Sequence, residues 1–166
     1  MNNGYLEIKH YFKQLVENSN FLKDFSGYFN RELQNVIGSS DGVDNPYLAL
    51  YKYKLGLEGP EQNTVAVRKI GFAIMFDNVD SEDFELQYKS VDDAEQFALK
   101  VISRIKYDNN LKNHILFNSF IKDSVQILPV ELSNTSFGVE VLLSLRNKQS
   151  LSLIAEDWKD INSVCD

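Results

Sequence analysis

The residues that could carry chemistry are few and far apart in this 166-residue chain. It has two histidines, His10 and His114, and a single cysteine, Cys165. A zinc site needs three or four His, Cys or carboxylate ligands at close spacing, and His10 has only Glu7 nearby. Cys165 lacks the helical or basic surroundings that activate a thiol. We therefore expect two hydrogen-bonded or solvated histidines, an unreactive thiol and no metal site.

Motifs for nucleotide binding and nucleophilic catalysis do not occur in the sequence. No glycine-rich loop joins a strand to a helix, no lysine sits in a phosphate cradle, and no serine lies in a Gly-x-Ser-x-Gly elbow. We predict no catalytic residue and no cofactor, which means that the protein is not an enzyme. An enzyme that uses a pair of carboxylates without a recognisable motif is an alternative. A deep pocket with convergent acids would favour it.

The acidic stretch from Asp77 to Glu85 raises the question of calcium. A twelve-residue calcium loop starting at Asp77 would need an oxygen ligand at Val79 and a glycine at Glu82, so the pattern fails. A solvated charged loop is the better interpretation.

Tyrosines and lysines alternate over 47–54, as they do on some platforms that stack single-stranded nucleic acid. Alternation, however, places Lys52 and Lys54 on the face opposite to the tyrosines. The net charge of −7, from 24 acidic and 17 basic residues, also disfavours nucleic-acid binding. We expect these tyrosines to pack in a core or an interface. An acidic surface suits a basic protein partner, or a surface that repels DNA.

The length fits one domain, which we place at residues 1–154, followed by a polar tail at 155–166. The first residues lack the basic and apolar regions of a signal peptide, and no apolar run reaches the roughly 20 residues of a membrane helix. One cysteine allows no internal disulfide. These features predict a cytoplasmic protein that does not bind membranes.

Apolar spacing predicts two N-terminal helices within residues 5–36, separated by a kink or loop at Asn18–Asn20. Ser19 or Asn20 would cap the second helix. Its apolar stripe would be Phe21, Phe25, Phe29 and Leu33.

Two hairpins and a helix are predicted after this region. Strands over 47–57 and 64–76 form the first hairpin, with one face of its first strand made of Tyr47, Ala49, Tyr51, Tyr53, Leu55 and Leu57. A helix capped by Ser90 covers 91–105 and closes at 107–110. Strands over 124–132 and 137–145 follow, the first at an edge or bulged because of Pro129. Leu151–Ile154 is a candidate fifth strand. The fold class is α+β: a mainly antiparallel sheet of four to five strands with helices on one face.

This order of elements resembles that of the tail terminator proteins of long-tailed phages and of phage-derived contractile particles. The matching segments are Tyr5–Val16, Tyr47–Phe76, Ser90–Ile105 and Ser124–Leu145. Similar proteins often have a segment like Val125-Gln126-Ile127-Leu128-Pro129, a polar turn, and then a strand like Gly138-Val139-Glu140-Val141. The resemblance extends over about residues 5–154 and consists of a pattern of elements rather than an invariant motif.

The resemblance implies a structural protein without catalysis. It further implies that the subunits form a hexameric ring that caps the tail tube and meets the head connector. Association would use sheet edges and loops, because edge strands offer unpaired backbone groups. The acidic surface would line a lumen through which DNA slides. The alternative is a small acidic cytosolic binding protein, such as an immunity protein that occupies the basic active site of a toxin.

Overall fold

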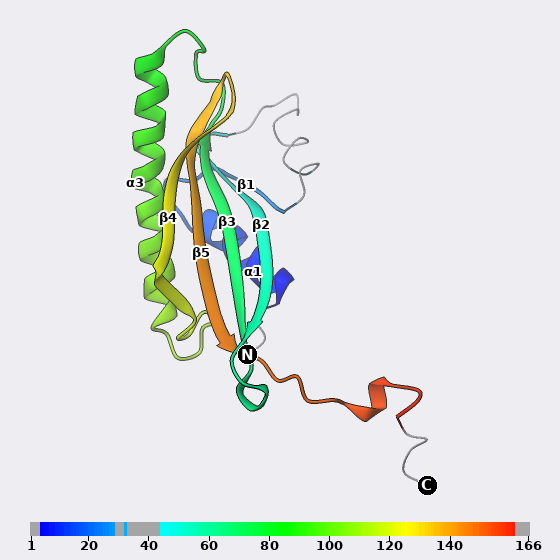
Figure 1. The fold of residues 1–166 in the computed structure, drawn as a ribbon. Helices are drawn as coiled ribbons and strands as arrows, with labels where there is room; N and C mark the ends of the chain where they lie inside the picture. The colour runs from blue at the N-terminus through cyan, green and yellow to red at the C-terminus, as the bar shows by residue number, and fades with distance from the viewer. Residues whose placement is uncertain (1–3, 29–31, 33–43, 162–166) are drawn as a thin grey trace.

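The computed structural model describes residues 4–28, 32 and 44–161. Their helices and strands are α1 (Tyr5–Glu17), β1 (Asp24–Ser26), β2 (Tyr47–Glu58), β3 (Val65–Phe76), α3 (Phe84–Asn109), β4 (Phe120–Ser133) and β5 (Ser136–Lys148), with short 3-10 turns at Glu61–Asn63 and Ala155–Asp157. The strands form one sheet in the order β1-β2-β3-β5-β4 (Figure 1). β1 pairs in parallel with β2, and all other pairs are antiparallel. The predicted α+β class is confirmed.

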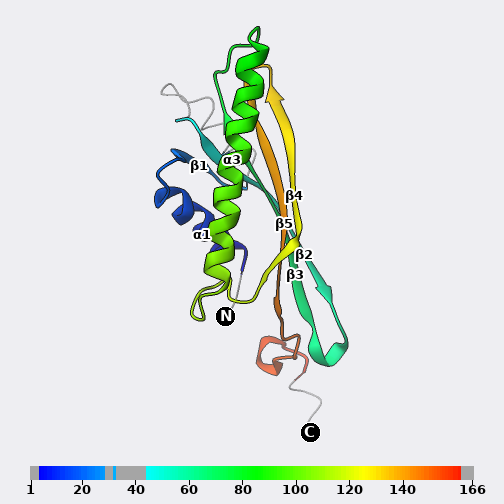
Figure 2. The same cartoon turned by 90° about the vertical axis from the view of Figure 1, so that its left-hand side faces the viewer.

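Both helices lie on the same face of the sheet (Figure 2). The apolar stripe of α1 packs over β1 and β2 and that of α3 over β3, β5 and β4, against alternate residues of each long strand, as the period of two along a strand requires. The large side chains that are fully buried in this layer include Ile8, Phe12, Leu48, Leu50, Ile70, Phe72, Ile74, Ile105 and Leu145. No helix in the described part of the chain is long and apolar enough to cross a membrane.

A β-bulge divides β2 into two halves with opposite orientation. The register with β3 shifts between Leu50 and Lys52. Before the bulge, Tyr47 belongs to a small buried cluster on the far face of the sheet; after it, Tyr53 packs on the helix side. The prediction that all alternate residues from Tyr47 to Leu57 share one face is therefore wrong, because one extra residue in a strand reverses every side chain beyond it.

The predicted second N-terminal helix is wrong over residues 21–28, where Asp24–Ser26 forms β1, whereas Glu32, within the predicted range, is helical. The Ser19 hydroxyl accepts a hydrogen bond from the Leu22 backbone N–H at 3.0 Å, which makes a turn rather than a helix start. The edge of β2 then supplies backbone partners for β1. Phe21 stacks on Phe97 of α3 at 5.1 Å between ring centroids. Residues 29–31 and 33–36 of the predicted helix lie outside the described residues.

The long helix α3 begins at Phe84 and not after Ser90. Asp83 is its N-cap, and its carboxylate accepts a hydrogen bond from the Leu86 N–H at 2.9 Å. Ser90 is buried within the helix, and its hydroxyl donates to the Leu86 carbonyl. The apolar residues of the first two turns, Phe84, Leu86 and Tyr88, are exposed, so they do not continue the buried apolar stripe from which the helix was predicted. The predicted C-terminal end is confirmed, since Asn110 is the C-cap.

The second hairpin has its predicted form. β4 is an edge strand that contains Pro129, and its register with β5 shifts between Ile121 and Gln126. The candidate strand Leu151–Ile154 is wrong: these residues form no strand. The physical reason is that β5 is already paired with β3 on one side and β4 on the other, so a chain that leaves it meets no free edge.

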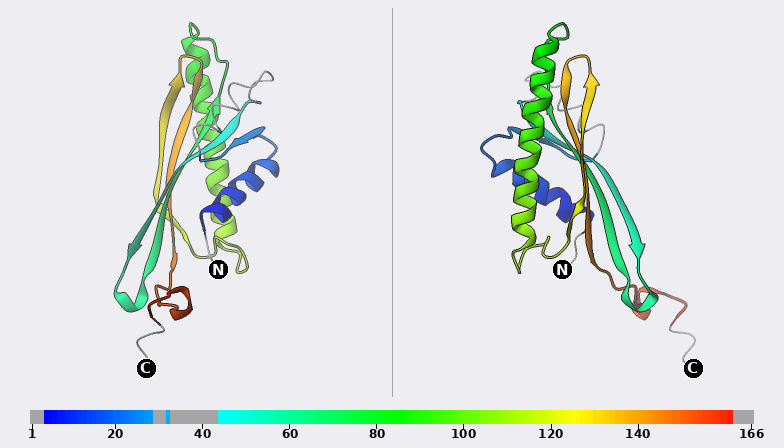
Figure 3. Two further views of the ribbon diagram at one scale, coloured as in Figure 1. Left: turned by 90° about the vertical axis from the view of Figure 1, so that its right-hand side faces the viewer. Right: turned by 60° about the vertical axis from the view of Figure 1, so that its left-hand side comes forward.

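The sheet is longer than the helices that cover it. The β2–β3 hairpin continues past α1 and α3 and ends in a turn beyond them (Figure 3). Leu55 and Leu57 therefore remain 49% and 51% exposed, although they lie on the helix side.

Gly138 allows the closest approach between two strands, and it offers a test of this packing. A Cβ at Gly138 would overlap the Ile74 carbonyl oxygen and meet the Met75 sulfur at 2.9 Å, whereas a Cβ at Gly56 would lie 3.8 Å from its nearest neighbour, the Val67 carbonyl oxygen. We expect Gly138→Ala to lower the free energy of unfolding by about 3 kcal/mol or more. Gly56→Ala should change it by less than about 1 kcal/mol. Urea denaturation measures both, and equal effects would contradict the packing described.

Candidate functional site

No site residue is predicted from the sequence, and the structure places the histidines and acidic residues considered there apart from one another. His10 is exposed on α1. Among the described residues, no three His, Cys, Asp or Glu side chains are grouped to hold a metal ion. Asp77 differs from the predicted solvated loop, because it is buried and accepts a hydrogen bond from the Ser136 hydroxyl. Cys165 lies outside the described part of the chain.

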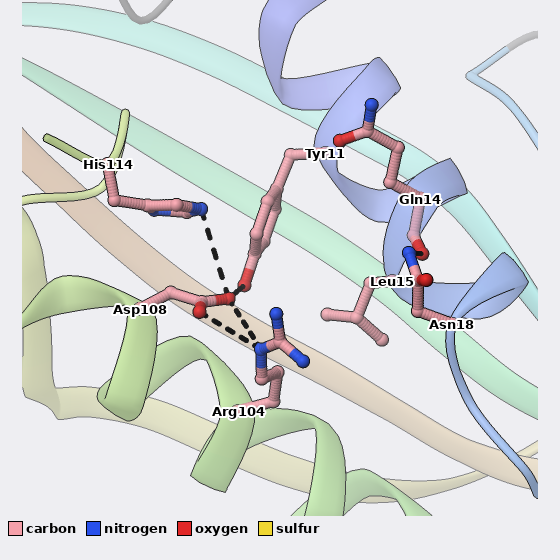
Figure 4. A pocket seen from close by; sticks show the side chains of 7 residues that line it. All are labelled: Tyr11, Gln14, Leu15, Asn18, Arg104, Asp108 and His114. Carbon is pink, nitrogen blue, oxygen red and sulfur yellow. Dashed lines mark hydrogen bonds and ion pairs between the residues drawn. The ribbon is translucent and has the colours of Figure 1, made fainter. Parts of the chain in front are cut away.

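A cluster of polar side chains joins α1 to the end of α3 (Figure 4). Asp108 is at its centre, only 1% exposed. The Tyr11 hydroxyl donates to Asp108 Oδ2 at 2.9 Å. Arg104 Nε donates to Oδ1 and Oδ2 of the same carboxylate at 3.0 and 2.9 Å. A buried carboxylate requires such donors, because an isolated buried charge is very costly.

His114 completes the cluster from the turn after α3. Its Nδ1 accepts a hydrogen bond from the Leu116 backbone N–H at 3.2 Å. In the neutral ring the proton is therefore on Nε2, which lies 4.0 Å from Asp108 Oδ2. The ring also contacts Tyr11 edge-on, with 5.4 Å between centroids. Protonation of His114 would add a positive charge facing the carboxylate.

Tyr11 is a hydrogen-bond donor in this cluster and not a base. Burial raises the pKa of its hydroxyl well above the ordinary value of 10.0, and the negative charge of Asp108 and the hydrogen bond to it raise it further. The phenol thus keeps its proton throughout the physiological range.

The space beside these side chains is small. It has a volume of about 70 Å³ and is lined by Tyr11, Gln14, Leu15, Asn18, Arg104, Asp108 and His114. That is room for about two waters. Asp108 is the single carboxylate in the lining, and its oxygens are already engaged. We call Tyr11, Arg104, Asp108 and His114 the polar clamp. It fixes α1 against α3, because Tyr11 of α1 donates its hydrogen bond to Asp108 of α3.

A larger hollow lies at the end of the molecule where α3 begins. Residues of the first α3 turns and of the β4–β5 hairpin line a groove of about 390 Å³: Phe84, Gln87, Tyr88, Val91, Pro129, Val130, Glu131 and Phe137. Phe84 and Tyr88 are 66% and 72% exposed. We call this surface the upper apolar surface. Contiguous exposed apolar groups of this kind mark binding surfaces.

A second apolar surface lies at the opposite end, beside the β2–β3 turn (Figure 1). It consists of Leu55 and Leu57 of β2 and of the segment that leaves β5, and we call it the lower apolar surface. The exposed large side chains of that segment are Leu151, Leu153, Ile154 and Trp158.

Comparisons with known proteins add no family to this description. No protein-family model matches the chain, and no curated protein sequence matches it.

Sequence reasoning missed both the clamp and the upper apolar surface. Arg104 and Asp108 have the i,i+4 spacing of a helical pair, but Tyr11 lies 97 positions before Asp108, so no local spacing joins it to the others. The upper surface had one available signal: Asp83 can cap a helix as well as Ser90 can, and an earlier start would have exposed Phe84 and Tyr88 as an apolar pair at spacing four.

The polar clamp predicts a graded loss of stability. Tyr11→Phe removes one donor to a buried carboxylate and should lower the free energy of unfolding by about 1.5–3 kcal/mol. Asp108→Ala should cost at least as much, since it leaves the Tyr11 hydroxyl buried without an acceptor. The surface pair Lys13 and Glu17 is a matched control: Glu17→Ala should change stability by less than about 1 kcal/mol. Chemical denaturation measures all three, and a neutral Asp108→Ala would refute the clamp.

Alkaline pH should weaken the clamp. Because the pKa of Tyr11 is raised in the folded state, its contribution is complete below the unfolded pKa of about 10 and is lost as pH rises above it. Burial also raises the pKa of Tyr28 and of Tyr47, and both residues are present in wild type and in Tyr11→Phe. Because only wild type has the Tyr11 hydroxyl, it should lose more stability than Tyr11→Phe between about pH 9 and pH 11. Thermal melts across this range measure the difference, and parallel curves would contradict it.

Proposed function

We propose that this protein is a structural assembly subunit, similar to a phage tail terminator: a ring-forming protein that caps a tail tube, joins it to the head connector and performs no catalysis. The observation that carries the proposal is the pair of apolar surfaces at opposite ends of one molecule. The resemblance in the order of elements supports the same conclusion.

The positions of the two surfaces favour association between copies. The β2–β3 turn and the start of α3, beside which these surfaces lie, are at opposite ends of the molecule, so one copy cannot cover either surface with the other (Figure 1). A pair of different surfaces on each subunit produces head-to-tail contacts, and these close into a ring when the rotation per subunit allows it.

The charge of the chain fits a passage for DNA. The net charge of −7 repels phosphates, and the exposed acids before and within α3 add to this: Asp80, Glu82, Asp83, Glu85, Asp92 and Glu95. In this proposal such residues face the lumen of the ring, where DNA must slide without binding. The protein would act in the cytoplasm or within a phage-like particle.

The same acids support the second candidate, an immunity protein that covers the basic active site of a toxin. The two candidates differ in what the apolar surfaces do. An immunity protein needs one surface for one partner, while this chain exposes two.

Light scattering coupled to size exclusion tests the proposal across a series of concentrations, with negative-stain microscopy of the largest species. We expect closed rings whose mass is a multiple of the monomer mass. A strict monomer at every concentration, including after mixing with tail tubes, would overturn the proposal. A monomer that binds a basic nuclease-like protein would favour the second candidate.

A matched pair of variants locates the contact. Phe84→Asp, on the upper apolar surface, should shift the assembly towards monomer, because a charge would be buried in the interface. Leu99→Asp is the control, since Leu99 is also exposed on α3 but does not line the groove. Equal masses for both variants would contradict a role for the upper apolar surface.

A further inference from the structure

The segment that follows β5 has the sequence of a strand and no strand to pair with. In Gln149–Ile154, Leu151 and Leu153 alternate with serines, the pattern of a strand with one apolar face. Both leucines are 61% exposed. Ile154 has extended backbone angles, with φ −103° and ψ 107°. Apolar groups arranged in this way are stabilised when a sheet edge pairs with their backbone.

The lower half of β2 is a matching open edge. β1 pairs only with Tyr47–Ala49, and no strand among the described residues pairs with the outer side of β2 from Lys52 to Glu58. The opposite edge of the sheet, β4, carries Pro129 and a register shift, which are features that block added strands. The lower half of β2 has neither. Within residues 4–28, 32 and 44–161, this is the sheet edge left available.

We propose that Gln149–Ile154 of one copy adds to β2 of a second copy as an antiparallel strand. The register that pairs leucine with leucine places Leu151 opposite Leu57 and Leu153 opposite Leu55. Residues directly opposite in an antiparallel pair lie on the same face, so the four leucines form one apolar patch. This inference rests on the proposed function and identifies the lower apolar surface as one of its interfaces.

Charge complementarity supports this direction. The antiparallel strand carries Glu156, in the 3-10 turn that follows Ile154, towards Lys54 and Lys52. All three side chains belong to exposed residues. The reverse direction, with Leu151 beside Leu55 and Leu153 beside Leu57, would carry Glu156 past Glu58 and away from both lysines.

The segment cannot occupy this edge of its own copy in the same register. Lys148 pairs with Val65, which pairs with Glu58, so Lys148 is level with the end of β2. Neighbouring strands lie about 4.8 Å apart, which puts the position outside β2 about 14 Å from β5. Two residues, from Lys148 to Ser150, span at most about 7 Å. The Gln149 N–H is moreover bonded to the Thr64 carbonyl at 3.0 Å. A second copy must supply the strand.

Disulfide trapping tests the register in the full-length chain. In a Cys165→Ser background, Leu57→Cys and Leu151→Cys are introduced into separately tagged copies, which are mixed and oxidised. Directly opposite residues meet the distance requirement of a disulfide, so we expect a linked heterodimer. Leu57→Cys with Ser152→Cys is the matched control, because the Ser152 side chain faces the other way, and the cross-link should be lost. Equal yields from both pairs would overturn the register.

A copy carrying both Leu57→Cys and Leu151→Cys distinguishes the source of the strand. We expect links between copies. A link confined to single chains at high dilution would place the segment on its own copy and overturn the inference.

Light scattering on Leu151→Asp/Leu153→Asp separates this inference from the proposed function, with Leu99→Asp as the control. We expect loss of the large species in the double variant only, with circular dichroism unchanged. Rings that keep full mass in the double variant would overturn the strand exchange and leave the ring proposal standing. Specific cross-links in open fibres or dimers would support the strand exchange and contradict the ring.

Discussion

The whole architecture depends on β3, which is hydrogen-bonded along its entire length on both sides. Every residue from Val65 to Phe76 has a partner in β5, and eleven register pairs join β2 to β3. With both edges of β3 satisfied, the two long hairpins are held as one sheet and the helices need only cover one face. The β2–β3 hairpin extends beyond the helices at one end, and this is why Leu55 and Leu57 remain exposed there.

The helices are fixed on that face by two different interactions. Apolar burial supplies most of the stabilisation, since Phe12 contacts Phe72 and the α3 stripe lies over the same strands. Apolar packing has little directional preference, whereas the Tyr11–Asp108 hydrogen bond links one atom of α1 to one atom of α3. Such a contact specifies position more than it adds free energy, because removing a buried carboxylate from water offsets much of what its hydrogen bonds contribute.

The described surface suits recognition of proteins better than it suits chemistry. The clamp has its polar atoms engaged with one another, and the exposed features are apolar surfaces, an unpaired strand edge and a strand-like segment. Each of these becomes stable only when another chain covers it. These features are the basis of the proposed ring.

The sequence by itself determined the elements with strong local patterns. Alternation specified the two hairpins, Pro129 specified an edge strand, and the polar residues at 107–110 specified the end of α3. Where two residues could both begin a helix, tertiary packing decided which of them does. Ser90 and Asp83 are both good caps, and only the packing of the completed helix selects Asp83.

Only the tertiary structure decided what long-range contacts control. Phe21 and Phe25 have the spacing of a helix, yet the free edge of β2 draws Asp24–Ser26 into the sheet. The bulge at Leu50–Lys52 reverses the tyrosine face, a change that alternation cannot reveal. The clamp joins Tyr11 to Asp108, 97 positions further along the chain. Leu151–Ile154 carries the pattern of a strand, but a strand needs a partner edge, and the pairing of β5 on both sides leaves none within reach.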